Sequence, residues 1–481
     1  MSEKLKTGLI YGISIAFIAI NLYLIIQHDF YWFLLFPVLV LLFFVYFFAL
    51  DKFILLIVFS TPLAINFRDF EAGFGISLPT EPMMFAVLVI FIIRLFYSFP
   101  FDKKILKHPV TVFILIHLAW MLITVLTSEM PLVSLKAFIA RLWFVIPFFF
   151  LGTQIFRKPE NVKAFLWAYM IPLIGVVSYT IIHHSSYGFG EEQGHWVMWP
   201  FYNDHTAYGA VIALFIPTLL GFVFNKDQKS SFRVISLIIF VFLVAALIFS
   251  YSRASWIGLA ASFLIFGLIY FRIKFRYVFT VIAAFLFVFF YFQHQIIDTL
   301  ERNKQDSSSD LVEHIHSIYN ISTDASNLER INRWQSALRM FAERPVFGYG
   351  PGTYQFLYAP FQRTKEKTII STNAGDLGNA HSEYIGPMAE QGIMGLLGFF
   401  FIGVFTIWTG IRLYRRAASK EVRLTAVFIT LGLITYFIHG FLNNFLDTDK
   451  ASVPFWGFIA ILVSYDLYYG KKEVDNGNET N

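Results

Sequence analysis

Residues 232–271 read FRVISLIIFVFLVAALIFSYSRASWIGLAASFLIFGLIYF. Two apolar runs, residues 232–250 and 254–271, are separated here only by a short polar turn that contains Arg253. Each run has about the 20 residues that a helix needs to cross the roughly 30 Å hydrocarbon core of a bilayer. Because lipid offers no hydrogen-bond partners to the backbone, each run must be helical. The stretch therefore predicts two transmembrane helices joined by a tight turn.

The composition of the whole chain agrees with this interpretation. Of its 481 residues, 57% are hydrophobic and 14% are charged, and the mean hydropathy is +0.62. Such a chain has too little polar material to cover a soluble particle. Because the sequence contains no cysteine, disulfides, thiolate nucleophiles and cysteine metal sites are excluded. We predict an integral membrane protein.

Similar runs recur along almost the whole chain, so we predict an all-α polytopic membrane protein with about 12 to 14 transmembrane helices. The runs lie at residues 8–27, 30–49, 53–66, 82–99, 109–127, 131–152, 160–183, 205–224, 232–250, 254–271, 275–293, 384–411, 422–442 and 453–469. The third is short, and the first lacks a signal-peptide cleavage pattern, so it is expected to be a retained helix. Residues 1–293 then hold the first eleven spans, residues 294–383 form one large extracytoplasmic helical loop, and residues 384–481 hold the last three spans and a cytoplasmic tail.

The distribution of basic residues orients the predicted spans. With the N-terminus inside, 23 of the 37 Lys and Arg residues fall in cytoplasmic loops and tails, and nine lie in the long loop. The positive-inside rule exempts long loops, because they cross regardless of charge. Five basic residues remain: Arg68, Lys136, Arg141, Arg253 and Lys450. The net charge of +5 therefore reports membrane orientation, and we expect no nucleic-acid partner.

The long loop has two recognisable parts. Asn303 to Asp310 is polar throughout and is typical of a solvated linker. From Leu328 to Glu343 the apolar residues share one helical stripe, which consists of Leu328, Ile331, Trp334, Leu338 and Phe341. This stripe predicts a helix that lies on the membrane surface or on the roof of the bundle.

Two arginines lie where a charge is expensive. An arginine at mid-helix costs about 2.5 to 3.5 kcal/mol on insertion scales, so each one needs a reason. Arg141 lies inside an apolar span, roughly three turns from its outer end, and Arg253 occupies the tight outer turn. A planar guanidinium there is suited to grip phosphate oxygens with two hydrogen bonds. The alternative for both is a snorkelling side chain or a structural ion pair.

His381 stands at the junction between the long loop and the next span. A histidine titrates near neutrality and can take a proton from a hydroxyl, although a hydrogen-bonded structural histidine is the alternative. Glu390, nine residues further on, is expected at the membrane edge, where it could hold the imidazole, pair with an arginine or serve as a buried anchor.

Four segments, in order, carry a resemblance to a known family. His381-Ser382, followed after nine residues by Gly392 and then Gly395, resembles the signature after the periplasmic loop of the O-antigen ligase/polymerase superfamily. Arg330 to Arg339, an Arg-Trp helix, runs into the Pro/Gly turn from Pro345 to Gly352 and resembles the loop motif of that family. The turn at Ser252-Arg253 and the entry at Asn203 resemble two further span entries. The similarity covers roughly residues 130 to 445.

The resemblance implies a metal-independent glycosyltransferase without a cofactor. Such enzymes transfer saccharides from undecaprenyl diphosphate to an acceptor hydroxyl on the outer face of the bacterial inner membrane. Carried over by motif, His381 would be the catalytic base, and Arg141, Arg253 and Arg333 would bind the diphosphate. Glu390, Asn203 and His205 would be supporting residues. Fourteen spans exceed the twelve usual for the ligases, and the extra pair is expected at the N-terminus.

This chemistry is physically reasonable, because a lipid diphosphate is already a good leaving group. The enzyme needs mainly to neutralise its charge and to deprotonate the acceptor. The displacement would invert the anomeric centre, without the paired carboxylates of a hydrolase.

Several alternatives stay open. The acceptor could be lipid A core sugar, the end of another glycan in a polymerase, or a protein hydroxyl. From another class, a lipid-linked saccharide flippase would also carry cations within the membrane, but it would need them in both leaflets. A metal site in the outer loop is a further alternative, although no spacing fixes three ligands on one face among His183, His184, His195 and His205.

Overall fold

The computed structural model describes residues 3–69, 74–97, 102–274, 325–363 and 378–470, with a few isolated positions between 276 and 287. The predicted span at 275–293, apart from those positions, and the linker at 303–310 lie outside the described residues. The chain divides into an N-terminal unit, Met1–Ile57, and a main unit, Val58–Asn481. Each is a separate compact unit.

The N-terminal unit is helical and apolar. It contains α1 (Glu3–His28), a 3-10 turn (Trp32–Leu35), α2 (Phe36–Phe48) and most of α3 (Leu50–Ser60). Most of its large apolar side chains are exposed. Exposed apolar side chains on every face of a helix are suited to a lipid environment.

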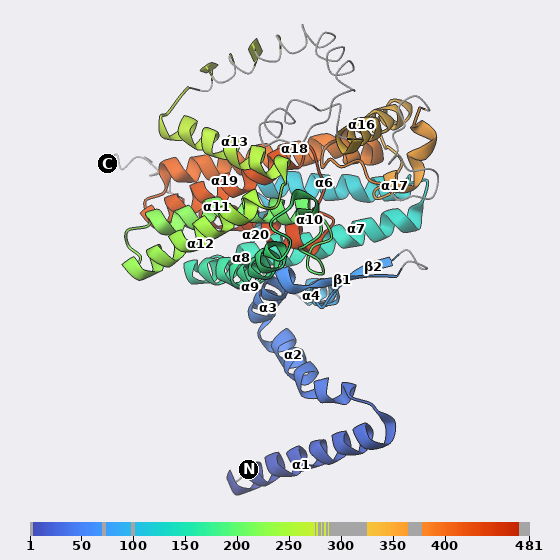
Figure 1. The fold of residues 1–481 in the computed structure, drawn as a ribbon, viewed down its shortest axis with the longest axis vertical. Helices are drawn as coiled ribbons and strands as arrows, with labels where there is room; N and C mark the ends of the chain where they lie inside the picture. The colour runs from blue at the N-terminus through green and yellow to red at the C-terminus, as the bar shows by residue number, and fades with distance from the viewer. Residues whose placement is uncertain are drawn as a thin grey trace, which may run out of the picture. The chain divides into compact units, whose positions relative to one another are not determined.

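The main unit is a bundle of long helices (Figure 1). Its order is α4 (Thr80–Phe96), α6 (Pro109–Leu126), α7 (Pro131–Val145), α9 (Pro159–Ser185), α11 (His205–Phe224), α12 (Ser230–Ile248), α13 (Arg253–Tyr270), α18 (Ile385–Arg416), α19 (Lys420–His439) and α20 (Asp449–Tyr469). Helix α7 continues through a π-helical stretch (Ile146–Leu151) into α8 (Gly152–Ile155). Within the described residues, ten helices of the chain are long and apolar enough to span a membrane. The protein is thus an all-α, multi-pass membrane protein, as predicted.

The third predicted span, residues 53–66, differs from the structure. Helix α3 has only 11 residues and ends at Ser60, so at about 1.5 Å per residue it is too short to cross alone. Pro62 lacks the N–H that a continued helix needs, and the chain enters a 3-10 turn (Thr61–Leu63). An antiparallel hairpin follows, in which β1 (Ile65–Asp69) pairs with β2 (Phe74–Leu78). The hairpin begins only at Ile65, so it lies almost wholly beyond the predicted span.

Helices α11, α19 and α20 are the most deeply buried of the membrane-length helices. Small residues permit the close approach of α11 and α19: a Cβ built on Gly432 would lie 2.3 Å from the carbonyl oxygen of Leu214. Small residues at helix contacts are a regular device of membrane bundles. This packed centre supports the helix ends on which the candidate site is built.

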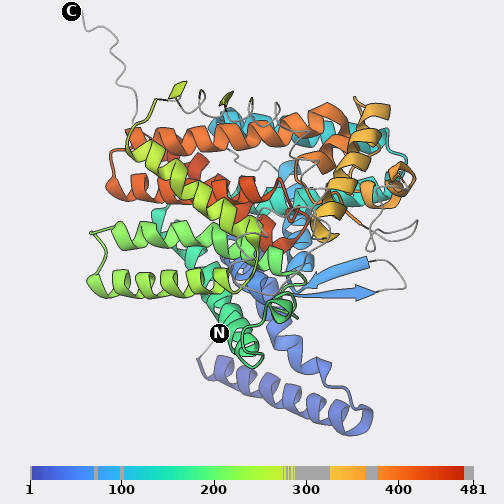
Figure 2. The same ribbon diagram turned by 45° about the horizontal axis from the view of Figure 1, so that its top comes forward.

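Helix α16 (Ala325–Glu343) confirms the helix predicted in the long loop. It packs against α18, and the two helices lie side by side in Figures 1 and 2. The predicted apolar stripe is only partly its packing face: Leu338 is exposed, Ile331, Trp334 and Phe341 are half-buried, and the fully buried positions include Arg333, Ser336 and Met340. The face of α16 turned toward the protein is partly polar. We call this end of the bundle the α16 end.

Candidate functional site

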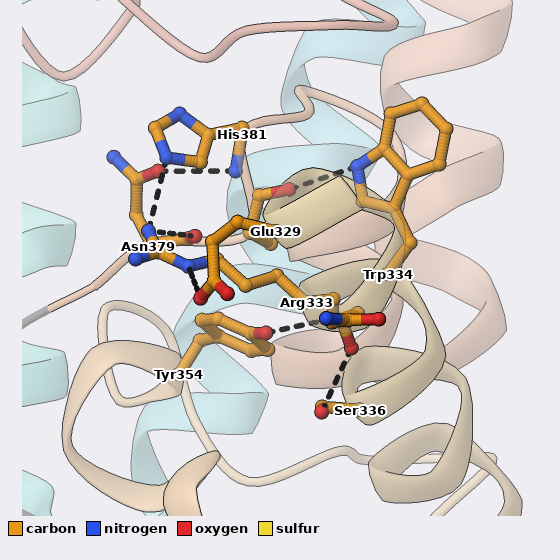
Figure 3. A network of polar contacts seen from close by, with 9 residues as sticks. Glu329, Arg333, Trp334, Ser336, Tyr354, Asn379 and His381 are labelled. Atoms are coloured by element: carbon orange, nitrogen blue, oxygen red, sulfur yellow. Dashed lines mark hydrogen bonds and ion pairs between the residues drawn. The ribbon is translucent and has the colours of Figure 1, made fainter. Parts of the chain in front are cut away.

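His381 and Arg333 are in direct contact at the α16 end (Figure 3). Nη1 of Arg333, on α16, lies 3.0 Å from Nε2 of His381, on the segment that leads into α18. An arginine has no acceptor, so the guanidinium must donate and Nε2 must accept. The neutral imidazole therefore carries its proton on Nδ1 in this arrangement.

Burial lowers the pKa of His381 to about 4, with further lowering by the positive charges of Arg333 and Arg330, while Asp204 acts in the opposite direction. The imidazole is consequently neutral at physiological pH, which is the protonation state of a base. Its Nε2 lone pair is nevertheless occupied by Arg333. The nitrogen becomes available only when that guanidinium finds another acceptor.

Arg333 is itself held in place on several sides. Its Nε donates to Oε1 of Glu329 at 2.9 Å, one turn earlier on α16, and both side chains are largely buried. Its Nη1 also donates to the carbonyl oxygen of Asn379 at 3.3 Å. Gly378 leaves room for the guanidinium, because a Cβ there would lie 2.7 Å from the Arg333 Cζ. The charge is thus balanced by one carboxylate and positioned beside the imidazole.

The backbone around His381 is specialised as well. His381 has a φ of +47°, in the left-handed region that few non-glycine residues occupy. Its N–H donates to Oδ1 of Asn379 at 3.0 Å, and Nε1 of Trp334 donates to the carbonyl oxygen of Ala380. Ser382 Oγ accepts from the N–H groups of Tyr384 and Ile385, where α18 begins. The His-Ser pair of the motif therefore combines a positioned imidazole with a helix cap.

The two glycine-containing motifs dock against each other. The N–H groups of Tyr349 and Gly350 donate to the carbonyl oxygens of Ala389 and Glu390. Helix α18 is interrupted at Gly392, where φ is +67° and a Cβ would lie 2.0 Å from the Val346 carbonyl oxygen. Only glycine fits that conformation without strain. The docking fixes the Pro/Gly turn, and with it α16, to the start of α18.

Glu390 joins this junction to a cavity. Its Oε1 accepts from the backbone N–H of Tyr354 at 3.0 Å, at the start of α17 (Tyr354–Leu357). The Glu390 side chain also lines a cavity of about 190 Å³ at the α16 end. No hydrogen bond joins Glu390 to His381 within the described residues, so it does not hold the imidazole directly.

Arg141, on α7, borders the same cavity. Its hydrogen bond runs from Nη1 to the carbonyl oxygen of Leu446 at 3.3 Å. Three carboxylates line the cavity with it, those of Glu383, Glu390 and Asp447. Glu383 is buried, and its Oε1 accepts from three donors, Tyr436 Oη and the N–H groups of Phe445 and Leu446. Burial raises the pKa of Glu383, and the positive charge of Arg141 partly offsets this.

Arg253 lies apart from this network. It is the first residue of α13, and its Nη2 is 3.9 Å from Oε1 of Glu191, on the short helix α10 (Glu191–Gly194). Both side chains are about one-third exposed. In the described part of the chain, Arg253 makes no direct contact with His381. Its guanidinium is accessible and only loosely paired.

His205 and Asn203 lie at the start of α11, as predicted. Asp204 caps this helix by accepting from the Thr206 N–H, and His205 Nδ1 lies 2.8 Å from the Ser250 carbonyl oxygen. Asn203 is exposed. The electrostatic influence of Asp204 reaches His381, His205 and also His439 at the end of α19. Asp204 therefore lies near all three histidines.

Three of the four histidines between residues 183 and 205 have a ring nitrogen bonded to a backbone carbonyl oxygen. His183 Nδ1 lies 3.1 Å from the Val197 carbonyl oxygen, and His184 Nε2 lies 2.8 Å from that of Gly190. His195 stacks on His205 with ring centroids 4.2 Å apart. Among the described residues, no three His, Asp or Glu side chains are arranged to hold a metal ion.

Sequence reasoning missed three members of this region: Glu329, Asp204 and His439. Glu329 stands four residues before Arg333, the spacing of a helical ion pair, so that signal was present in the sequence. His439 ends an otherwise ordinary apolar span, and no local pattern marks it. Only the fold brings it near Arg330 and Asp204.

Comparison with known proteins supports the predicted resemblance. Residues 238–400 match the sequence profile of a family described as O-antigen ligase. This stretch contains Arg253, Arg333, His381 and Gly392. The chain is also similar to an uncharacterized protein of Haemophilus influenzae (strain ATCC 51907 / DSM 11121 / KW20 / Rd), with 23% identity over 238 residues. That alignment covers 49% of this chain and 57% of the relative, which is less than two thirds of its length.

Proposed function

We propose that this protein, whose residues 238–400 match the O-antigen ligase family, is a membrane glycosyltransferase. It transfers a glycan from undecaprenyl diphosphate to an acceptor hydroxyl on the outer face of the bacterial inner membrane. The observation that carries the proposal is the contact between the neutral His381 imidazole and the Arg333 guanidinium, 3.0 Å apart. A base and an anion-binding group lie side by side, which is what transfer from a lipid diphosphate requires.

In the proposed reaction, the acceptor oxygen attacks the anomeric carbon and gives its proton to Nε2 of His381. The bond between the anomeric carbon and the diphosphate oxygen breaks, and undecaprenyl diphosphate leaves with the bonding electron pair. The anomeric centre is inverted, because there is one displacement. The chain's own side chains supply the base and the positive charge that this step needs.

Arg333 couples donor binding to the base in this proposal. With no donor bound, its Nη1 occupies Nε2 of His381. A diphosphate oxygen is a stronger acceptor for a guanidinium than a neutral imidazole is. When the diphosphate takes over this hydrogen bond, Nε2 becomes free to receive the acceptor proton. The anion also offsets the positive charge that then develops on the imidazole.

The remaining predicted residues take supporting parts. Arg253, accessible and 3.9 Å from Glu191, is assigned to the diphosphate as a second guanidinium. Asn203 and His205, at the start of α11, are assigned supporting roles near the donor-binding arginines. Glu390 fixes the start of α17 and borders the cavity. Arg141, also predicted as a donor-binding residue, lines that cavity.

The experiment that tests the proposed function uses the purified full chain in lipid nanodiscs. It measures transfer from a synthetic undecaprenyl-diphosphate-linked saccharide to the acceptor of the producing strain. We expect transfer by the wild type and a loss of about 10²- to 10⁴-fold in His381→Ala, the usual contribution of a general base. His28→Ala, an exposed histidine at the end of α1, serves as the matched control and should transfer normally. Equal activity in the His381→Ala and control proteins would remove His381 from the reaction.

The acceptor is resolved by a deletion strain. Loss of glycan attachment with intact chain length would indicate a ligase, and chains of a single repeat would indicate a polymerase. Loss of glycan from secreted proteins alone would indicate protein glycosylation. Accumulation of lipid-linked glycan on the cytoplasmic side would instead favour a flippase and would contradict the proposed transferase.

A further inference from the structure

The cavity beside Arg141 is lined in part by the segment that carries His381. Asn379 and Ser382 line it, whereas the His381 ring between them in sequence turns toward Arg333 (Figure 3). Its walls come from α6, α7, the α17 turn, the first turns of α18 and the loop after α19. It is therefore adjacent to the candidate base and shares Asn379 and Tyr354 with the Arg333 network, although neither Arg333 nor His381 is among its lining residues.

The lining is dense in hydrogen-bonding groups of both kinds. Besides Arg141 and the three carboxylates, the amides of Gln355, Asn379 and Asn444 border the cavity. Carboxylate oxygens accept hydrogen bonds, a guanidinium donates them, and an amide does both. The ring of Tyr354 adds an apolar surface to the cavity lining.

Part of this hydrogen-bonding capacity is unused within the described residues. Arg141 has five N–H donors, and its hydrogen bond is the one to Leu446. Gln391 also lines the cavity; it is buried, and its Oε1 has no hydrogen-bond partner. Buried polar groups are nearly always hydrogen-bonded, so a group without a partner points to a bound molecule.

The charge of the lining decides which kind of molecule fits. Among the described lining residues, one guanidinium lies with three carboxyl groups. Burial raises the pKa values of Glu383 and Asp447, but no second cation lines the described part of the cavity to balance the charge of a diphosphate. A saccharide is neutral or weakly charged, and each hydroxyl can donate to a carboxylate and accept from an amide or guanidinium. We propose that this cavity binds the hydroxyl groups of a saccharide, and that Arg141 holds sugar rather than diphosphate.

This inference rests on the proposed function and adds a division of labour to it. Arg333 holds the diphosphate beside His381, and the cavity, which borders the same segment 379–383, holds sugar. The anomeric carbon of the donor then lies between the two, beside His381. The sugar belongs either to the donor glycan or to the acceptor glycan, and the same hydroxyl chemistry serves both.

Binding is tested by calorimetry on the purified full chain. The probes are the glycan released by mild acid from the lipid-linked pool of the producing strain and, separately, the acceptor glycan of that strain. Gln355→Ala and Asp447→Asn should each weaken binding of one probe by about 2- to 10-fold, the effect of one lost hydrogen bond. Gln335→Ala, an exposed amide on α16, is the matched control and should bind as the wild type does. The probe that responds identifies the source of the sugar.

Two results would overturn the saccharide site. One is wild-type protein that binds neither glycan. The other is Gln355→Ala and Asp447→Asn proteins that bind both glycans as tightly as the control. Because calorimetry needs no turnover, these results are independent of whether the transfer assay succeeds. Failed transfer with intact, cavity-dependent glycan binding would refute the proposed reaction and leave the saccharide site standing.

Inhibition by inorganic pyrophosphate distinguishes sugar from diphosphate in the transfer assay. Arg333→Gln should raise the inhibition constant of pyrophosphate by at least about 10-fold, because a charge-assisted contact is lost. Arg141→Gln should leave that constant unchanged and raise the KM of the glycan substrate. Equal increases in the inhibition constant of pyrophosphate for both variants would show that Arg141 binds the diphosphate and would contradict the proposal.

Discussion

Arg333 and Arg141 both lie near the segment 379–383, but their surroundings differ in kind. Within the described residues, Arg333 is buried, paired with the carboxylate of Glu329 and bonded to an imidazole. Arg141 borders an open cavity with three carboxylates and is bonded to one backbone carbonyl oxygen. The sequence suggested the same ligand for both. We infer that the groups around a guanidinium decide which substrate atoms it can hold.

Glu329→Ala, which removes the partner of Arg333, is expected to have the largest effect on stability and transfer. Removing one partner of a buried ion pair leaves an uncompensated charge, which typically costs about 3 to 5 kcal/mol. We expect a matching fall in the free energy of unfolding and a strong loss of transfer. Glu343→Ala, at the exposed end of the same helix, should change neither thermal unfolding nor transfer. A Glu329→Ala protein as stable as this control would show that Arg333 does not depend on Glu329.

Replacing Arg253 or Arg141 by lysine tests whether the two arginines hold different substrate groups. Lysine keeps the charge but loses the planar fork of arginine. Arg253→Lys should reduce transfer about 10- to 100-fold, the value of a hydrogen bond between charged groups. Arg141→Lys should reduce it less, because its proposed partners are neutral hydroxyls. Rates measured at saturating donor give this ranking, and the reverse order would contradict the assignment of Arg253 to the diphosphate.

Gly392→Ala tests the junction between the Pro/Gly turn and α18. Its Cβ would lie 2.0 Å from the Val346 carbonyl oxygen at a φ of +67°, and strain of this kind costs about 1 to 3 kcal/mol. We expect a lower unfolding temperature and weaker transfer. The matched control is Gly175→Ala in α9, where no heavy atom lies within 4 Å. That variant should be neutral or slightly stabilising.

The smallest effect is a shift in pH dependence. His381, with a pKa of about 4, is neutral from about pH 5 upward, so the wild-type rate should fall only as the pH drops toward 4. Removing the positive charge in Arg333→Gln raises the pKa of His381, although burial still lowers it. A larger share of the imidazole is then protonated at pH 5, and the ratio of the rate at pH 5 to the rate at pH 7 should decrease. An unchanged ratio would mean that the acidic limb belongs to another group.

The membrane fold was largely predictable, because span length and apolar composition are local properties. The predicted span at residues 160–183 corresponds to α9 (Pro159–Ser185), and that at 205–224 coincides with α11. The prediction at 53–66 was wrong as a full span, since α3 ends at Ser60 and Pro62 prevents its continuation into the hairpin that follows.

The site was predictable only in its individual residues. The sequence singled out His381, Arg333 and Arg141, but it could not show which of them meet. The carboxylates beside Arg141 come from Glu383, Glu390 and Asp447, which lie more than 200 residues further along the chain. Only the packing of α7 against α20, and of α6 against α18, brings them together. The hydrogen bond between Arg333 and His381 likewise depends on the docking of α16.

The central claim is that His381 removes the acceptor proton, and chemical rescue tests it most directly. The measurement is the transfer rate of purified His381→Ala with and without added imidazole, together with the affinity of the same preparation for the undecaprenyl-diphosphate donor. If His381 is the base, the variant binds the donor normally, transfers at least about 10²-fold more slowly than the wild type, and recovers part of its rate as imidazole is added. Normal donor binding with a slow rate that imidazole leaves unchanged would assign His381 a structural role and contradict the account.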